Sequence, residues 1–254
     1  MIPYRDENPT VRTPILTWTI VAANVAVWLL VQGGGAEGPL VQSVCKLGLI
    51  PAELLQRAEP GALKKLGEGA FCTLGGGRQV EHLFTSMFLH GSWMHIIGNM
   101  WFLWIFGNNV EDSMGKLRFA VFYVLCGLGA AAAQVAGSPN SMVPMVGASG
   151  AIGGVMGAYV ILYPRVRVFT FVPLGFFMTS VALPAWVMLG YWMLLQLLGT
   201  LGGAEAGVAF WAHIGGFAAG AVLIKLFARP DYIAEHQARH WRPRHLGFQQ
   251  NGWR

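Results

Sequence analysis

Charge is the scarcest property of this 254-residue sequence. Only 11% of the residues are charged, whereas 54% are hydrophobic, and the mean hydropathy is +0.49. A water-soluble domain carries about 25% charged residues, and a disordered chain needs low hydrophobicity, so both classes are excluded. Cysteine is scarce as well, because 3 cysteines are too few for a disulfide-rich scaffold. The composition therefore predicts a membrane protein with several spans.

Stretches that lack charge locate the predicted spans. A charged side chain at the centre of a bilayer costs about 2.5–3.5 kcal/mol, and a helical span needs about 20 apolar residues. The candidate spans are 15–32, 93–110, 119–137, 148–164, 184–201 and 207–226. The segment 168–180 contains Pro173 and Gly175, so it is predicted to be an apolar surface or interfacial segment. The predicted fold class is an all-α membrane protein, a bundle of six transmembrane helices with a long first outer loop.

The distribution of Lys and Arg predicts the orientation of the chain. Twelve of the 17 lie in the N-terminus, in the loops at 116–118 and 165–167, and from 225 to the C-terminus. Cytoplasmic loops carry an excess of Lys and Arg, so we expect a multi-pass protein of the cell (inner) membrane with both termini cytoplasmic. Spans two, four and six then run inward from the outer face.

The net charge of +5 raises the question of a nucleic-acid partner. The basic residues gather near the cytoplasmic ends of spans and in the C-terminal tail, as positive-inside topology and attraction to anionic lipid head groups require. The lipid bilayer is therefore the predicted partner, and nucleic acid is not.

The cysteines leave one question open. Cys126 falls inside a predicted span and is expected to be a core residue. Cys45 and Cys72 share the outer loop, at about 33–92. A disulfide between them is possible if that face is oxidising, and two free thiols are an equal alternative.

Four polar residues inside the predicted spans suggest chemistry, because polar groups are costly within a membrane and usually functional there. They are His95, Asn99, Ser149 and His213. The first two are four residues apart and share one helix face. All four lie near the beginnings of spans two, four and six, and we therefore expect them to converge at a similar depth below the outer surface.

Small residues predict close approach of spans four and six. Gly153 and Gly157 follow the serine at four and eight residues, and Gly216 and Gly220 follow the second histidine at three and seven residues. Small residues with this spacing allow helix backbones to touch. These glycines are thus predicted to support helix packing that brings Ser149 Oγ within hydrogen-bond reach of His213.

A serine beside a histidine predicts nucleophilic catalysis. Ser149 would attack a carbonyl carbon while His213 takes its proton and later delivers it to the leaving amine. The candidate donors to the oxyanion are the backbone N–H of Ser149, the Asn99 amide and the His95 imidazole. No acidic third member is evident in spans four and six, so a Ser–His dyad is the simpler hypothesis. His90 and His95 have no carboxylate or cysteine at a metal-like spacing, so no metal is predicted.

Taken together, these motifs identify a resemblance to the rhomboid intramembrane serine proteases, from about Pro14 to Arg229. The motifs are HGSWMHIIGN at 90–99, FGNNVED at 106–112, GASG at 147–150 and AHIGGFAAG at 212–220. In this order and spacing they are specific. The resemblance divides the chain into a cytoplasmic N-terminus (1–13), a six-span protease domain (14–229) and a basic cytoplasmic tail (230–254).

The resemblance also implies roles for the four polar residues. Ser149 and His213 would form the catalytic dyad, and His95 and Asn99 would support the oxyanion. The family cleaves single-span membrane protein substrates at or near the membrane face and uses no cofactor or metal. Some members stack a tyrosine, four residues after the serine, on the histidine, and here that position is Gly153. Trp211 and Tyr159 are the candidates to supply a ring instead.

Two other functions compete with proteolysis. One is a catalytically silent rhomboid-like protein that binds membrane clients, although such relatives usually lack the serine or the histidine. The other is a small-molecule transporter, which is disfavoured because the chain shows no internal repeat and no broken, charge-lined spans in paired halves.

Overall fold

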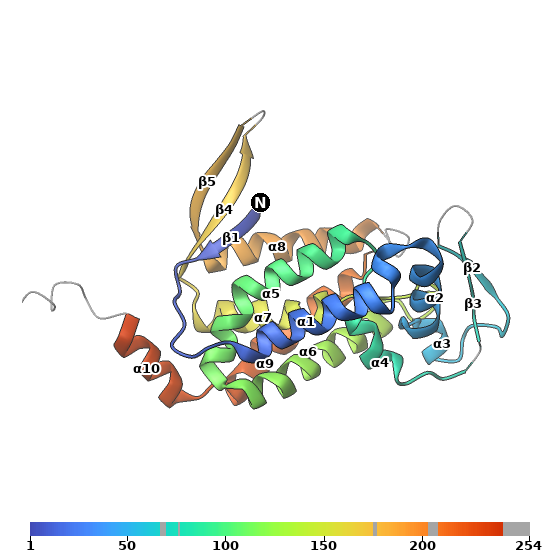
Figure 1. The fold of residues 1–254 in the computed structure, drawn as a ribbon, viewed down its shortest axis with the longest axis horizontal. Coiled ribbons are helices and arrows are strands. Elements are labelled where there is room, and N and C mark those ends of the chain that lie inside the picture. The colour runs from blue at the N-terminus through green and yellow to red at the C-terminus, as the bar shows by residue number, and fades with distance from the viewer. Residues whose placement is uncertain (67–69, 76, 175–176, 203–207, 241–254) are drawn as a thin grey trace, which may run out of the picture.

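The helices of the molecule form an elongated bundle (Figure 1). The computed structural model describes residues 1–240 except 67–69, 76, 175–176 and 203–207. The long helices of the bundle are α1 (Ile15–Leu30), α5 (Trp93–Met114), α6 (Lys116–Gly137), α7 (Ser149–Leu162), α8 (Ala185–Gly199) and α9 (Phe210–Phe227). Each begins close to the start of one of the predicted spans. Long apolar runs without charge, from which the spans were predicted, thus form helices in the structure.

Length and hydropathy separate five of these helices into two groups. Among the described residues, α6 and α9 are long and apolar enough to cross a membrane. The helices α1, α7 and α8 are apolar but shorter. The number of spans, predicted as six, therefore stays a prediction.

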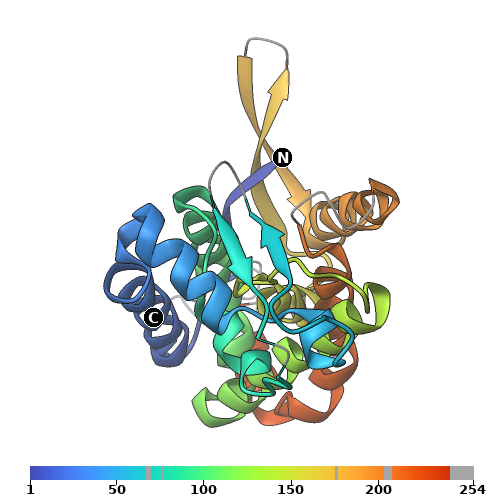
Figure 2. The ribbon, with the colours of Figure 1, turned by 90° about the vertical axis from the view of Figure 1, so that its right-hand side faces the viewer.

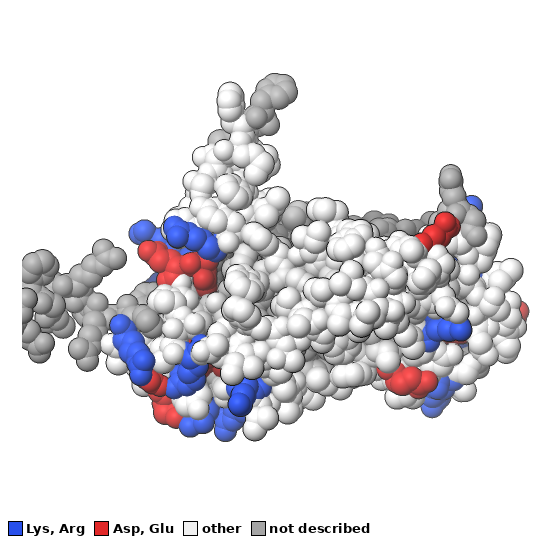
Figure 3. Space-filling view, in the orientation of Figure 1, with Lys and Arg blue, Asp and Glu red and all other residues white. Residues whose placement is uncertain are grey.

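Charged side chains lie at the two ends of the elongated molecule. Figure 3 shows Lys, Arg, Asp and Glu at both ends of this face, with an uncharged zone between them. Exposed large apolar side chains occur on the bundle helices, such as Trp104 on α5 and Val222 on α9. An uncharged, apolar zone of this kind is what hydrocarbon contact requires.

The predicted outer loop, residues 33–92, folds over one end of the bundle. Its elements are η1 (Gly33–Gly35), α2 (Glu37–Leu47), α3 (Pro51–Leu54), β2 (Leu63–Lys65), β3 (Phe71–Thr73), α4 (His82–Thr85) and η2 (Ser86–Phe88). Strands β2 and β3 pair antiparallel and lie in front of the bundle in the end-on view of Figure 2. A disulfide joins Cys45 of α2 to Cys72 of β3, which answers the question that the sequence left open, while Cys126 is a buried free thiol.

A small sheet at the other end adds strands to the fold predicted as all-α. It consists of β1 (Ile2–Asp6), β4 (Arg167–Leu174) and β5 (Phe177–Pro184), all antiparallel, in the order β1-β4-β5. The predicted surface segment at 168–180 therefore lies in a β-hairpin. Its valines, phenylalanines and threonines favour strands, and Pro173 disfavours a helix.

The N-terminal residues and the last described helix are attached to this same end. Tyr159 Oη donates a hydrogen bond to Asp6 Oδ2 at 2.6 Å, and burial raises the pKa of the Asp6 carboxyl to about 6. The helix α10 (Pro230–His240) lies in the predicted tail, whose remainder, 241–254, is outside the described residues. The Arg12 guanidinium bridges Glu235 of α10 to Asp112 of α5.

Glycines allow α7 and α9 to pack with their backbones in contact. A Cβ atom at Gly216 would lie 1.9 Å from the Gly150 carbonyl oxygen, and one at Gly220 would lie 1.9 Å from that of Gly154. No side chain fits at such distances, so these positions require glycine.

The other two predicted packing glycines lie on the facing helix, where Cβ atoms at Gly157 and Gly153 would lie 2.1 Å and 3.0 Å from α9 carbonyl oxygens. The polar residues at the starts of these helices are held close together as a result.

Candidate active site

Ser149 and His213 meet where α7 and α9 begin. Ser149 is the first residue of α7, and His213 lies in the first turn of α9. Ser149 Oγ and His213 Nε2 are 2.8 Å apart, which is hydrogen-bond distance. This distance is the one that a nucleophile and its base need.

Gln196 of α8 is a further partner of the histidine. Its Oε1 lies 2.7 Å from His213 Nδ1, and its Nε2 donates to the Trp192 carbonyl oxygen at 3.2 Å. Because Oε1 can only accept, Nδ1 carries the proton of the neutral ring. Nε2 then has a free lone pair, which accepts the Ser149 Oγ–H.

An aromatic ring also contacts this histidine. The Trp192 ring centroid lies 5.6 Å from that of His213, with the planes tilted by 40°. The sequence-based candidates for this ring were wrong. Tyr159 binds Asp6 at the other end of α7, and Trp211 packs beside Gly137 of α6.

A signal in the sequence could have identified both missed residues. Trp192 and Gln196 are four residues apart in an apolar helix, so they share a face. Gln196 is a polar residue in the span predicted at 184–201, and it is only 8% exposed. The rule that selected the other polar residues applies equally to this glutamine.

Potential donors to an oxyanion are supplied by α5, which lines the same cavity as the serine. His95 Nδ1 accepts a hydrogen bond from the Gly91 N–H at 3.3 Å, which leaves the ring proton of a neutral imidazole on Nε2. Asn99 is 7% exposed, and its Nδ2 has no hydrogen-bond partner among the described residues. Two N–H groups are thus available from one face of α5.

Gly147 keeps the space between His95 and the serine open. Its φ is +129°, and a Cβ atom there would lie 2.8 Å from His95 Nε2 and 3.4 Å from Ser149 Oγ. Both the conformation and the space therefore favour glycine immediately before the serine turn. The sequence motif contains this residue, but its function in the site was not foreseen.

The loop that precedes α5 is held by the end of α1. Gln32 Nε2 donates to the His90 carbonyl oxygen, and the His90 N–H donates to Gln32 Oε1, each at 2.8 Å. The buried His90 ring lies edge-on to His95, with centroids 5.2 Å apart. His95 is therefore positioned by His90 and Gly91 of this loop, and Gln32 in turn holds the loop.

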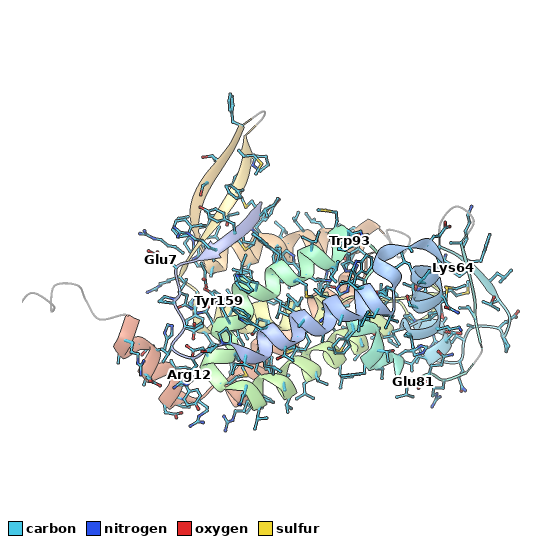
Figure 4. The ribbon with its side chains drawn as sticks, viewed as in Figure 1. Glu7, Arg12, Lys64, Glu81, Trp93 and Tyr159 are labelled. Atoms are coloured by element: carbon cyan, nitrogen blue, oxygen red, sulfur yellow. A yellow bond between two sulfur atoms is a disulfide. The ribbon has the colours of Figure 1, made fainter. Side chains whose placement is uncertain are left out.

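All four predicted site residues line one cavity of about 390 Å³, together with Trp192 of α8 and residues of the chain before α7. Figure 4 labels Trp93 at the start of α5, toward the end of the molecule where Lys64 lies, and Tyr159 of α7 toward the opposite end. Since His95 follows Trp93 closely, the cavity lies toward the end that the outer loop covers. Within the described part of the chain, no group of three or more His, Cys, Asp or Glu is placed to hold a metal.

This arrangement can be compared with known proteins. The sequence model of the Rhomboid domain matches residues 77–230, more than half of the chain. Similar curated proteins include RHOMBOID-like protein 6, mitochondrial, from Arabidopsis thaliana, at 31% identity over 165 residues, 61% of this chain and 53% of that protein. Rhomboid-like protease 5 from Toxoplasma gondii is 28% identical over 214 residues, 74% of this chain and 23% of that protein.

A yeast relative extends the comparison. Rhomboid protein 1, mitochondrial, from Saccharomyces cerevisiae is 29% identical over 149 residues, 52% of this chain and 41% of that protein. The chain spans about half the length, or less, of these relatives. The part of this chain that matches the Rhomboid domain includes every residue that lines the cavity described above.

Proposed function

The chain belongs to the rhomboid family, with an α-helical membrane fold, and we propose that it is an intramembrane serine endopeptidase that cleaves single-span membrane proteins. The observation that carries the proposal is the 2.8 Å contact between Ser149 Oγ and His213 Nε2 inside the cavity that all four predicted site residues line. A hydrogen bond in which the imidazole lone pair accepts the serine O–H is the arrangement that activates a serine nucleophile.

The chemistry begins with proton transfer. Ser149 Oγ–H gives its proton to His213 Nε2 as the oxygen attacks the carbonyl carbon of the scissile bond. The resulting imidazolium is stabilised by Gln196 Oε1, which accepts its Nδ1–H. His213 then protonates the leaving amine, and the carbon–nitrogen bond breaks to leave an acyl enzyme on Ser149. Attack by water, with His213 again as base, releases the second product.

The negative charge on the tetrahedral oxygen needs donors already in place. We assign this role to His95 Nε2–H, Asn99 Nδ2–H and the backbone N–H of Ser149, which is the first residue of its helix. Such donors act strongly in a site shielded from bulk water, because no solvent reorganisation is needed during the reaction. Each one typically contributes about 2.7–4 kcal/mol.

The proposed orientation follows from the charge distribution. We propose that the end bearing β1 and α10 is cytoplasmic, with six spans and both termini on that side. The cavity then opens toward the outer half of the membrane, within reach of a substrate segment that has left its helix. The protease domain in this proposal is 14–229, and the membrane is the cell (inner) membrane.

A serine-reactive probe tests the proposal without a known substrate. Purified protein in detergent is treated with a fluorophosphonate, and the modified residue is located by mass spectrometry. We expect modification at Ser149 that is lost in Ser149→Ala and in His213→Ala. The matched control is Ser141→Ala, which removes another serine that lines the same cavity and should leave the labelling intact.

The same experiment distinguishes a protease from the competing function. Thermal unfolding of each variant establishes that the sample is folded. An absence of labelling in folded wild-type protein would contradict the protease proposal and favour the alternative, a catalytically silent protein that binds membrane clients.

A further inference from the structure

The β4–β5 hairpin extends away from the bundle in two perpendicular views (Figures 1 and 2). No charged residue occurs from Val168 to Pro184, and the described part of the hairpin is white in Figure 3. The nearest cations along the chain are Arg165 and Arg167, at its base. An apolar projection of this kind is unfavourable in water and needs a partner.

One face of the hairpin continues the surface that packs on the bundle. Val168 and Thr170 are fully buried at its base, and Val168 belongs to the hydrophobic core. Since alternate residues of a strand share a face, Val172 lies on this face further out. Val181 and Phe177 lie on it too, because they pair with Thr170 and Leu174. Phe177 is 78% exposed, and none of the bundle helices reaches as far as this end of the hairpin in Figure 1.

The opposite face is covered by groups suited to water and lipid head groups. The Tyr4 ring of β1 stacks on Phe171 with centroids 4.4 Å apart, and Tyr4 Oη is hydrogen bonded to Ser180 Oγ at 2.7 Å. The Arg5 guanidinium lies over the Phe169 ring, 4.2 Å from its centroid. The two faces of the sheet are therefore chemically different, and only one of them is continuous with the apolar surface of the bundle.

The backbone limits the depth at which this hairpin can lie. In the order β1-β4-β5, strand β5 is an edge, and its outward N–H and C=O groups have no strand partner in the sheet. Unpaired backbone groups are not tolerated against hydrocarbon but are satisfied by water at the level of the head groups. In Figure 1 the hairpin leans from the charged end of the molecule toward the uncharged zone.

We propose that the β4–β5 hairpin is a lipid-binding element that lies in the head-group region of the membrane leaflet at this end of the bundle. The face of Phe177, Val172 and Val181 contacts acyl chains, and the face that carries Met178 and Ser180 is turned to head groups and water. The exposed Arg165 and Arg167 at the base lie at the level of the lipid phosphates. Because α8 begins directly after β5, the hairpin also anchors the helix that carries Gln196.

Neighbouring residues on opposite faces provide a matched test. Phe177 and Met178 are adjacent and both exposed, at 78% and 62%, but they point to different faces. Each is replaced separately, as Phe177→Cys and Met178→Cys, in a Cys126→Ala background that keeps the disulfide. A bimane fluorophore on the new thiol is then read in proteoliposomes. Quenchers are phosphatidylcholine brominated on its acyl chains and, in separate samples, iodide on both sides of the membrane.

The expected result is a reversal between the two positions. Bromolipid quenches the probe at 177 at least threefold more than the probe at 178, whereas iodide quenches the probe at 178 more strongly. Iodide quenching of both probes would place the hairpin in water and overturn the proposal. A probe at 177 that is shielded from both quenchers would indicate a protein partner or a second copy, and would overturn it too. Fluorophosphonate modification of Ser149, or thermal unfolding, verifies that each variant is folded.

Discussion

At the residue scale, Gln196 determines which nitrogen of His213 faces the serine. The side-chain amide accepts from Nδ1 through Oε1 and is itself held by the Trp192 carbonyl oxygen. A neutral amide in this position orients the imidazole but does not neutralise the imidazolium that forms during the reaction. In the proposed mechanism Gln196 is therefore a positioning residue, which acts only through His213.

Gln196→Met should lower the rate of serine labelling and of substrate cleavage by about 10-fold to 100-fold. The substitution removes the acceptor of the His213 Nδ1–H, and leaving this buried donor without a partner costs about 1–3 kcal/mol. The apolar side chain of methionine is similar in size, so the packing of α8 is retained. The measurement is kcat and KM separately, and the loss should appear in kcat.

The conservative variant Gln196→Glu provides the control for this prediction. Its carboxylate still accepts from Nδ1, so most of the activity lost in the methionine variant should be retained. Equal activity in wild type and Gln196→Met would show that the orientation of the ring is maintained without this hydrogen bond.

At the element scale, the site depends on how closely α7 approaches α9. Gly150 and Gly154 meet Gly216 and Gly220 backbone to backbone, with no side chain between them. Ser149 and His213 are held at the ends of these two helices, so a change in helix separation is transmitted directly to the 2.8 Å contact.

Gly220→Ala should destabilise the protein, because the added Cβ would lie 1.9 Å from the Gly154 carbonyl oxygen. Overpacking of this kind costs about 1–3 kcal/mol or more, and each kcal/mol lowers Tm by about 2–4 °C in a domain of this size. Thermal unfolding in detergent measures the effect.

Gly190→Ala is the matched control, since a Cβ at Gly190 of α8 would meet nothing within 4 Å. It should leave Tm unchanged or raise it slightly, as alanine favours a helix over glycine by about 0.5–1 kcal/mol. If the two variants unfold at the same temperature, α7 and α9 do not pack as closely as the structure shows.

At the scale of the whole molecule, the two ends differ in how they are held together. One end is closed by ion pairs around Arg12 and by the sheet that contains β1. The other is covered by the outer loop, in which the disulfide crosslinks residues 27 apart in sequence. Such a crosslink reduces the conformational entropy of the unfolded chain.

Reduction of the disulfide should lower the free energy of unfolding by about 2–4 kcal/mol. The measurement is thermal unfolding with and without a reductant, and Cys126→Ala should show the same shift as wild type because its thiol is not part of the bridge. The double variant Cys45→Ser, Cys72→Ser should be insensitive to reductant. A reductant that shifts the double variant equally would attribute the effect to something other than this bridge.

The sequence by itself determined the membrane class, the positions of the long helices, the rhomboid family and the polar residues that gather at the cavity. These features follow from composition and local spacing, since apolar runs without charge form helices and residues four apart share a helix face. Small residues at i+3 and i+4 likewise predicted that α7 and α9 would pack closely. The number of spans and the roles of the site residues remain predictions.

Only the tertiary structure decided which residues of other elements surround the histidine. Gln196 and Trp192 reach His213 from α8 because of how three helices pack, and no local pattern determines which face of α8 is turned to α9. The pairing of Cys45 with Cys72 and of β1 with β4 likewise joins segments far apart in the chain. Contacts of this kind depend on how all the helices and strands pack together, so they cannot be predicted from the local sequence of any one segment.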